Sequence, residues 1–431
     1  MLQKGRHEAL LVEVEERISS LPDNILHHIL SFLRTEEAVH TCVLSRRWRY
    51  IWMGIHTLHF NEYYYWNNKT NFLNFVEKFL LLHDGSLINM FKLVTDDCDD
   101  IEPRMEALVS TILRRKIQGL DFSIACPILY PGSLYCSESL TVLKLEGTSS
   151  TLSLPASVCF SSLKIMHLVL ITFTCEERFQ QVSFSCPILK ELKLTDCSFI
   201  SFEAMHIFVP LLERLTIEEL CQFLCLSSPE IKIYAESLVS LDVDSGLSFD
   251  YSFCNLFSLK SASIDIDNVD YASNLIQGIQ YVKELILSHY TLECLPSVKD
   301  LLALSNLKKL TLAWIYSFSG ELLTELLCSV PQIHSLIIEN ENYNCFEDYD
   351  FTLAEIPKSF LSHLKSLEIR QFFGNESELS LVELLLKNVR AVEKMTLVLS
   401  TELSKDLKKR NEVMRRLLIV PRASSCVINF S

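Results

Sequence analysis

One apolar pattern constrains this chain more than any other feature: L-x-x-L-x-L, with conservative substitutions, returns fourteen times between residues 55 and 397. Most intervals between successive starts are 21 to 29 residues, a spacing typical of stacked repeat units. The last two apolar positions of each unit alternate inward in a short strand. Because one unit alone buries little, the units are expected to stack in parallel around a continuous core. The fourteen triplets are Ile55, Leu58, Phe60; Ile88, Phe91, Leu93; Ile117, Leu120, Phe122; Leu140, Leu143, Leu145; Leu163, Met166, Leu168; Leu189, Leu192, Leu194; Leu212, Leu215, Ile217; Leu238, Leu241, Val243; Leu259, Ala262, Ile264; Val282, Leu285, Leu287; Leu307, Leu310, Leu312; Ile333, Leu336, Ile338; Leu364, Leu367, Ile369; and Val392, Met395, Leu397.

The pattern resembles that of leucine-rich repeats, but it is irregular. Such repeats usually carry Asn or Cys three residues after the last leucine, and Cys197 is the clear case here. We therefore predict an α/β fold: an irregular leucine-rich-repeat solenoid with parallel strands on its concave face. The segments on the convex side are expected to be helical in some repeats, as at Ser319 to Cys328, and looser in others.

Lysine recurs at the second position of six repeats, and stacking is expected to bring these lysines together along one edge of the concave sheet. Such a column favours an acidic or phosphorylated partner, and this is the candidate target-binding face. The alternative, which we favour from sequence alone, is that lysine keeps an exposed strand edge soluble. The six residues are Lys164, Lys190, Lys260, Lys283, Lys308 and Lys365.

Before the repeats, the segment Arg17 to Trp52 reads RISSLPDNILHHILSFLRTEEAVHTCVLSRRWRYIW. Pro22 and Asp23 are typical of the first turn of a helix, and Thr35 and Ser45 are predicted to cap a second and a third helix. A unit this small rarely buries a core of its own, and the segment carries more apolar side chains than it can cover. A protein partner is therefore expected. The predicted apolar face of the first helix consists of Ile25, Leu26, Ile29, Leu30 and Leu33.

This segment closely resembles an F-box, through Leu21-Pro22, Ile25-Leu26, Ile29-Leu30, the run Val43 to Arg49, and Trp52. An F-box implies docking onto a Skp-type adaptor and, through it, onto a cullin-based ubiquitin ligase. The predicted adaptor-binding residues are Leu21, Pro22, Ile25, Leu26, Ile29, Leu30, Val43, Leu44, Ser45, Trp48 and Trp52.

The C-terminal part is predicted to hold a strand at 363–370, a helix at 379–388, a strand at 393–400, a charged helix at 404–418 and a closing strand at 426–430. It resembles the FBD module of plant F-box proteins with leucine-rich repeats. The residues that carry this resemblance are Gly374, Glu378, the run Leu384 to Asn388, Glu393, Lys394, Met395, Arg422, Ala423, Ser424 and Cys426. The implied domains are an N-terminal tail at 1–16, the F-box at 17–54, the repeats at 55–356 and the FBD module at 357–431.

An open apolar face at the end of a repeat stack must be covered, so the FBD module is predicted to be the C-terminal cap. The side chains expected to point inward from the charged helix are Leu403, Leu407, Val413, Met414, Leu417 and Leu418. The basic residues of the same helix suit its solvent face, or alternatively a phosphate-binding or nuclear-targeting patch. They are Lys405, Lys408, Lys409, Arg410, Arg415 and Arg416.

Composition narrows the classes of function. A net charge of −15 disfavours general nucleic-acid binding, and no apolar run reaches the length of a membrane span. The N-terminus has no secretory signal pattern, so an intracellular location, in nucleus or cytoplasm, is expected, with the fifteen cysteines as free thiols. Asp96, Asp97, Asp99 and Asp100 suit a solvated loop better than a cation site. No catalytic motif, metal-ligand set or cofactor loop is found, so none is predicted.

The combined resemblance implies a substrate-receptor subunit of a Skp–cullin–F-box ubiquitin ligase, which is not itself an enzyme. The F-box binds the Skp adaptor and the repeats hold a protein target, whose identity the sequence does not give. Two alternatives remain: a small-molecule receptor of the F-box/repeat type, and a scaffold that binds the adaptor without a cullin. No membrane or nucleic-acid partner is expected.

Overall fold

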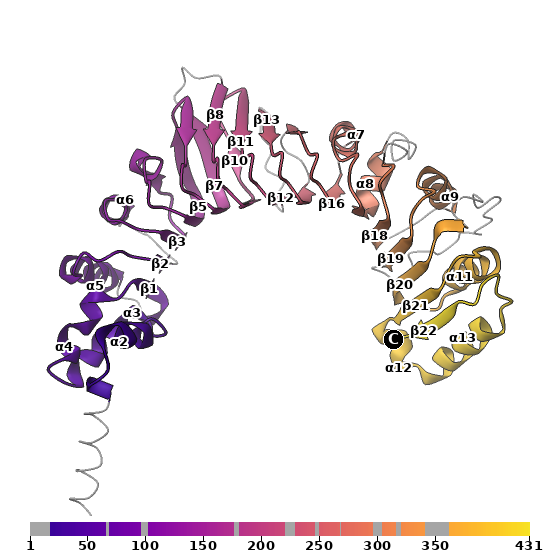
Figure 1. Cartoon of the computed structure of the whole chain (residues 1–431), viewed down its shortest axis with the longest axis horizontal. Helices are drawn as coiled ribbons and strands as arrows, with labels where there is room; N and C mark the ends of the chain where they lie inside the picture. Colours follow the sequence, from indigo (N-terminus) through magenta and orange to yellow (C-terminus); the bar gives the residue numbers. More distant parts are fainter. Residues whose placement is uncertain are drawn as a thin grey trace, which may run out of the picture. The chain divides into compact units, whose positions relative to one another are not determined.

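The computed structural model describes residues 18–65, 69–95, 102–175, 181–219, 229–245, 250–267, 269–295, 304–315, 320–340 and 362–431. The chain divides into two compact units, unit 1 (Met1–Phe202) and unit 2 (Glu203–Ser431), which are considered separately. Figure 1 draws unit 1 in indigo to magenta and unit 2 in pink to yellow. The predicted N-terminal tail at 1–16 and the predicted boundary between the repeats and the FBD module, at 356/357, fall outside the described residues.

Unit 1 begins with a group of short helices. These are α2 (Asp23–Leu30), α3 (Thr35–His40), η1 (Thr41–Val43), α4 (Trp48–Ile51) and η2 (Trp52–Gly54). The prediction that Thr35 caps the second helix is wrong, because Thr35 is the first residue of α3 and the N-cap is Arg34. The Glu37 side chain accepts a hydrogen bond from the Arg34 backbone N–H at 3.1 Å. The N-cap of α4 is Arg47, so the prediction that Ser45 caps the third helix is also wrong, although the Ser45 hydroxyl accepts a hydrogen bond from the Trp48 N–H at 3.4 Å.

The six repeats of unit 1 give parallel strands that pair in chain order. These strands are β1 (Thr57–Asn61), β2 (Met90–Thr95), β3 (Gly119–Ile124), β5 (Val142–Leu154), β7 (Ile165–Cys175) and β9 (Glu191–Thr195). The connections contain η3 (Glu62–Tyr65), α5 (Lys69–Leu82), α6 (Glu102–Leu113), β4 (Leu129–Tyr130), η4 (Gly132–Leu134), β6 (Ser157–Cys159), β8 (Gln181–Ser185) and β10 (Ser198–Phe199).

Among the described residues of unit 2, nine strands pair in parallel in chain order. They are β12 (Arg214–Glu219), β14 (Ser240–Ser245), β16 (Ser261–Ile266), β17 (Glu284–Ser288), β18 (Lys309–Ile315), β19 (Ser335–Asn340), β20 (Ser366–Phe372), β21 (Lys394–Leu399) and β22 (Val427–Phe430). The helices are α7 (Val269–Gly278), α8 (His289–Cys294), α9 (Gly320–Ser329), α11 (Glu376–Asn388), α12 (Thr401–Lys405) and α13 (Leu407–Ile419).

The core consists of the repeated apolar positions. Every side chain of the fourteen predicted triplets is buried, with at most 3% of its surface exposed. In most strands these residues alternate with partly or fully exposed ones, as in β12, where Leu215 and Ile217 flank Thr216. In β18 and β19 the intervening residues, Thr311 and Ile337, are also buried. The predicted mixed α/β class and the parallel pairing of successive repeats are therefore confirmed within each unit.

The outer segments differ from the prediction in the middle of the chain. In unit 2, β11 (Ala204–Phe208), β13 (Glu230–Tyr234) and β15 (Asp250–Cys254) pair in parallel as a second small sheet, where helices or loose segments were expected. The cause is a period of two in the connecting segments: Ile231 and Ile233 are fully buried, whereas Lys232 between them is half-buried. Alternating burial of this kind favours a strand over a helix.

The charged helix predicted at 404–418 is divided into α12 and α13. Asp406 stands between them, and its carboxylate accepts hydrogen bonds from the Lys408 and Lys409 backbone N–H groups at 3.1 and 3.0 Å. Of the predicted inward side chains, Leu403, Val413 and Leu417 are buried. Leu407 and Leu418 are 66% and 59% exposed, so that prediction is wrong for these two.

The closing strand is observed as β22, which pairs with β21. It extends the sheet, and the proposed capping role of this region stays a prediction. Among the described cysteines ten are free thiols, whereas Cys126 is disulfide-bonded, so the expectation of free thiols is wrong at Cys126. The Asp96 to Asp100 cluster lies outside the described residues. No described helix is both long and apolar enough to cross a bilayer.

Candidate functional sites

The first helix of unit 1 separates its apolar residues onto two faces. Leu26 and Leu30 are completely buried, whereas Ile25 and Ile29 are 42% and 40% exposed. The single apolar face predicted from the spacing is therefore divided, because only the i and i+4 pair Leu26 and Leu30 points inward. The outer pair remains uncovered in the chain alone.

The two tryptophans belong to the interior. Trp48 is 4% and Trp52 is 6% exposed, and the Trp52 ring contacts the Phe79 ring at a centroid distance of 5.3 Å. The indole N–H of Trp52 donates a hydrogen bond to the Arg49 carbonyl at 3.0 Å. Buried tryptophans usually satisfy their N–H in this way, so these rings stabilise the helical group and hold it against α5.

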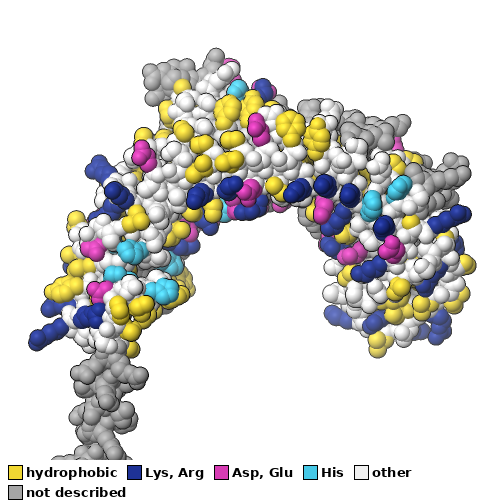
Figure 2. Space-filling view, in the orientation of Figure 1, with side chains coloured by type: hydrophobic (Ala, Val, Ile, Leu, Met, Phe, Trp, Pro, Cys, Tyr) yellow, Lys and Arg dark blue, Asp and Glu magenta, His cyan; other side chains and the backbone are white. Residues whose placement is uncertain are grey.

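Exposed apolar side chains gather on the outer side of the same helices. Val43 is 83% and Leu44 is 52% exposed. Arg47 holds α2 next to α4, since its guanidinium donates to the Ser19 carbonyl and to the Asp23 carboxylate. Hydrophobic side chains are visible on this end of unit 1 in the space-filling view (Figure 2).

The eleven predicted adaptor-binding residues thus fall into three groups. Pro22, Ile25, Ile29, Val43 and Leu44 are exposed, Leu21 and Ser45 are half-buried, and Leu26, Leu30, Trp48 and Trp52 are buried. Sequence reasoning missed four other exposed apolar side chains of this region: Ile18, Phe32, Leu33 as an outward residue, and Tyr50. Adaptor contact stays a prediction for every one of these residues.

The helical group is joined to the first repeat by buried polar contacts. The Thr35 hydroxyl is fully buried and accepts a hydrogen bond from the His59 backbone N–H of β1 at 2.7 Å. His83 Nε2 contacts the Ile55 carbonyl at 3.0 Å, and burial lowers the pKa of this imidazole. The Asp84 N–H donates to the Met53 carbonyl at 3.0 Å. The helices that carry the exposed apolar side chains are therefore joined to β1 by hydrogen bonds.

The predicted lysines lie immediately before the strands, in two backbone ladders. In unit 2 each ladder residue donates its backbone N–H to the carbonyl of its counterpart one repeat earlier: Lys283 to Lys260 at 2.9 Å and Lys308 to Lys283 at 2.8 Å. The ladder continues through His334 to Lys365, with bonds of 2.7 and 2.8 Å. In unit 1, a separate pair is formed, Lys190 to Lys164 at 2.8 Å.

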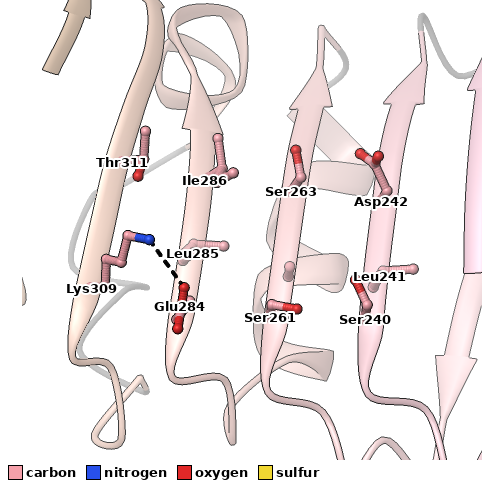
Figure 3. A pocket seen from close by; sticks show the side chains of 11 residues that line it. Ser240, Leu241, Asp242, Ser261, Ser263, Glu284, Leu285, Ile286, Lys309 and Thr311 are labelled. Carbon is pink, nitrogen blue, oxygen red and sulfur yellow. Dashed lines mark hydrogen bonds and ion pairs between the residues drawn. The ribbon is translucent and has the colours of Figure 1, made fainter. Parts of the chain in front are cut away.

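A hollow of about 280 Å³ lies on the strands just beyond this ladder in unit 2. Its lining crosses four strands from β14 to β18 and is mostly small or polar, with Ser261 and Ser263 in the middle (Figure 3). At one side the Lys309 ammonium pairs with the Glu284 carboxylate at 3.2 Å. Within the described residues, no group of three or more His, Cys, Asp or Glu is placed to hold a metal ion.

Comparison with known proteins agrees with these features. The family model for the F-box domain matches residues 18–58, and the model for FBD matches residues 354–397. F-box domains generally bind Skp-type adaptors. The chain is 28% identical to F-box/LRR-repeat protein 13 of Arabidopsis thaliana, over 95% of this chain and 94% of that protein. It is 29% identical to an FBD-associated F-box protein of the same plant, over 96% of this chain and 100% of the relative.

A third relative, an F-box/FBD/LRR-repeat protein of Arabidopsis thaliana, is 27% identical over 95% of this chain and 94% of its own length. The resemblance predicted from the sequence is therefore confirmed. The chain carries an F-box domain and an FBD domain and is similar, over nearly its whole length, to plant F-box/FBD/leucine-rich-repeat proteins.

Proposed function

We propose that this protein is the substrate-receptor subunit of a Skp–cullin–F-box ubiquitin ligase, located inside the cell. The observation that carries the proposal is the exposed apolar face of the F-box helices. Its most exposed members, Val43, Phe32 and Tyr50, have 83%, 77% and 60% of their surface in solvent. Burying a side chain of this size contributes about 1.5–3 kcal/mol, so a protein partner that covers the face gains several such contributions.

The contacts between the F-box and the first repeat support the same proposal. A substrate receptor acts by holding its target at a defined distance from the ubiquitin-charged enzyme, which raises the effective concentration of the two reactants. Hydrogen bonds such as His59 N–H to the Thr35 hydroxyl limit movement between the F-box and β1. In this proposal, catalysis belongs to other subunits, and the chain contributes adaptor binding and target binding.

The proposal is tested by placing a charge on the exposed apolar face. Val43→Glu should weaken binding to a purified Skp-type adaptor at least tenfold, because a carboxylate in an apolar interface is left desolvated and unpaired. The readout is the dissociation constant of the full chain with the adaptor, measured by calorimetry.

Leu81→Glu is the matched control. Leu81 lies on α5 of the same unit and is 83% exposed, as is Val43, so the two variants add the same charge at equally exposed apolar positions. The control should bind the adaptor as the wild type does. Equal binding by all three proteins would contradict the proposed adaptor face.

A further inference from the structure

The lysine ladder of unit 2 presents a row of charges with a fixed spacing. Lys260, Lys283, Lys308 and Lys365 are exposed, and each belongs to the run of backbone hydrogen bonds that passes from strand to strand. Neighbouring strands lie about 4.8 Å apart, so the ladder from β16 to β20 extends for about 19 Å. None of these four ammonium groups forms an ion pair with a residue that the structure describes.

The positive part of the ladder has a defined end. After Lys365 the next ladder residue is Glu393, which is exposed and donates its backbone N–H to the Lys365 carbonyl at 2.9 Å. Before Lys260 the ladder residue is Val239. The cationic stretch therefore covers the strands from β16 to β20, with His334 at the position before β19. The space-filling view shows a row of Lys and Arg side chains along the edge of the strands that is lowest in the picture (Figure 2).

The opposite ends of the first strands of unit 2 are acidic. Glu218 of β12 is in register with Asp244 of β14, and Asp244 with Asp265 of β16. Burial, and then the neighbouring carboxylates of Asp265, Asp242 and Glu218, raise the pKa of Asp244, as expected where like charges are close together. The exposed face is therefore positive before β16, β17, β18 and β20 and negative near the far ends of β12, β14 and β16, so β16 has a charge of each sign at its two ends.

The hollow lies between these two charged rows. Ser240, Ser261 and Ser263 line it with short side chains whose hydroxyls donate and accept hydrogen bonds (Figure 3). A larger side chain at any of these three positions would fill part of the space. The face thus combines a cationic row, an accessible floor of serines with Ile286 exposed beside them, and an anionic row.

We propose that this face of unit 2 binds an extended polypeptide segment of the target that is rich in Asp and Glu and also carries a basic residue. Its carboxylates lie against Lys260, Lys283 and Lys308, and the basic residue lies toward the acidic row. This inference rests on the proposed function, because it names the class of segment that the substrate receptor recognises.

Dimension and charge favour a polypeptide over other ligands. A row of about 19 Å matches about six residues of extended chain, which advance about 3.3 Å each. It is longer than a typical small ligand. A nucleic acid is disfavoured because its phosphates would meet the acidic row and a chain whose net charge is −15. A segment with charges of both signs can pair its carboxylates with the lysine row and its basic residue with the acidic row.

The test uses a random twelve-residue peptide display library, selected against the purified full-length protein. The proposal predicts enrichment of peptides with several acidic residues and one basic residue. For the enriched peptides made synthetically, Lys283→Ser/Lys308→Ser should weaken binding roughly threefold to thirtyfold, since each exposed ion pair contributes modestly. Circular dichroism checks that the variant is folded. A Lys260→Gln variant provides a single, milder substitution in the same row.

Lys405→Ser/Lys408→Ser is the matched control, because both lysines are exposed, lie on α12 and α13, and their loss changes the net charge equally. The control should bind the peptides as the wild type does. Selection of neutral or basic peptides, or equal weakening by both double variants, would overturn the proposal. Binding only when phosphoserine replaces the acidic residues would overturn the choice of Asp and Glu.

Measuring adaptor binding and peptide binding on the same variants distinguishes a failure of the peptide-binding face from a failure of the proposed adaptor face. If Val43→Glu does not change adaptor binding but the ladder variants lose the peptides, the proposed adaptor face fails and the peptide-binding face stands. If the F-box prediction holds and the ladder variants bind the peptides normally, only the peptide-binding face is wrong.

Discussion

Glu378 connects three parts of the FBD region through one buried carboxylate. It is 1% exposed and accepts hydrogen bonds from the backbone N–H groups of Phe373 at 2.9 Å and Gly374 at 2.6 Å. Its second oxygen accepts from the Asn340 amide of β19 at 2.7 Å. Burial raises the pKa of Glu378 to about 7, although the hydrogen bonds from these donors act in the opposite direction. The turn, the start of α11 and β19 are thus held by a group that titrates near neutrality.

This gives a pH-dependent prediction at the residue scale. The pKa of Glu378 in the folded protein is above the unfolded value, so its contribution to stability is complete below the unfolded pKa and is lost as pH rises through about 7. The free energy of unfolding of the wild type, relative to Glu378→Gln, should fall by about 1 kcal/mol between about pH 6 and about pH 8. Urea denaturation at several pH values measures it, and a constant difference would contradict the titration.

Two residues of the FBD resemblance have a clear physical reason in the structure. Gly374 has a φ of +66°, and a Cβ at this position would lie 2.9 Å from a Val413 side-chain carbon. Glu378 supplies the acceptor that the same turn needs. The sequence resemblance singled out both residues, but not their reasons, since neither the Asn340 contact nor the approach of α13 is visible in local sequence.

At the scale of elements, the F-box helices and the first repeat are joined where α3 meets β1. Thr35 is the central residue, because its buried hydroxyl accepts the N–H of a strand residue that begins the parallel sheet of unit 1. An edge strand normally leaves such groups exposed, and here a helix covers this one. Next to it, the Arg34 guanidinium lies 3.8 Å from the centre of the Tyr64 ring.

Thr35→Val should test this junction. Valine has nearly the same shape but no oxygen, so the His59 N–H is left buried without its acceptor, at a cost of about 1–3 kcal/mol in the free energy of unfolding. Hydrogen exchange at the His59 amide should become faster. Thr41→Val, which removes a half-buried hydroxyl bonded to the Ala38 carbonyl within the F-box, serves as the control and should leave that amide protected. Unchanged exchange in Thr35→Val would contradict the role of Thr35.

The repeats were predictable from the sequence and the junction was not. An inward residue such as Leu310 repeats at a period that any stacked strand requires, so its burial follows from local pattern. Thr35, by contrast, has the same sequence signature as a helix cap, and only its distance to His59 shows its other role. Ile25 and Leu26 are adjacent and both apolar, so the sequence does not show that Leu26 is buried and Ile25 exposed. That difference depends on which residues of other elements pack against the helix.

At the scale of the whole molecule, the chain contains two surfaces with different chemistry. The F-box surface in unit 1 is apolar, with Val43 and Leu44 exposed, and suits a permanent or tight partner. The ladder face of unit 2 is charged and polar and suits a target that must also be released. A receptor subunit needs both kinds of binding at separate places, and the ligase proposal accounts for both.

The most direct measurement of the central claim is affinity capture of the full-length protein from plant cells with the proteasome blocked, followed by quantitative mass spectrometry. The account predicts that the wild type recovers both a Skp-type adaptor and a cullin, and that Val43→Glu/Leu44→Glu loses both while its expression is unchanged. Recovery of neither protein with the wild type would contradict adaptor binding. Recovery of the adaptor without a cullin would contradict the ligase proposal and identify a scaffold.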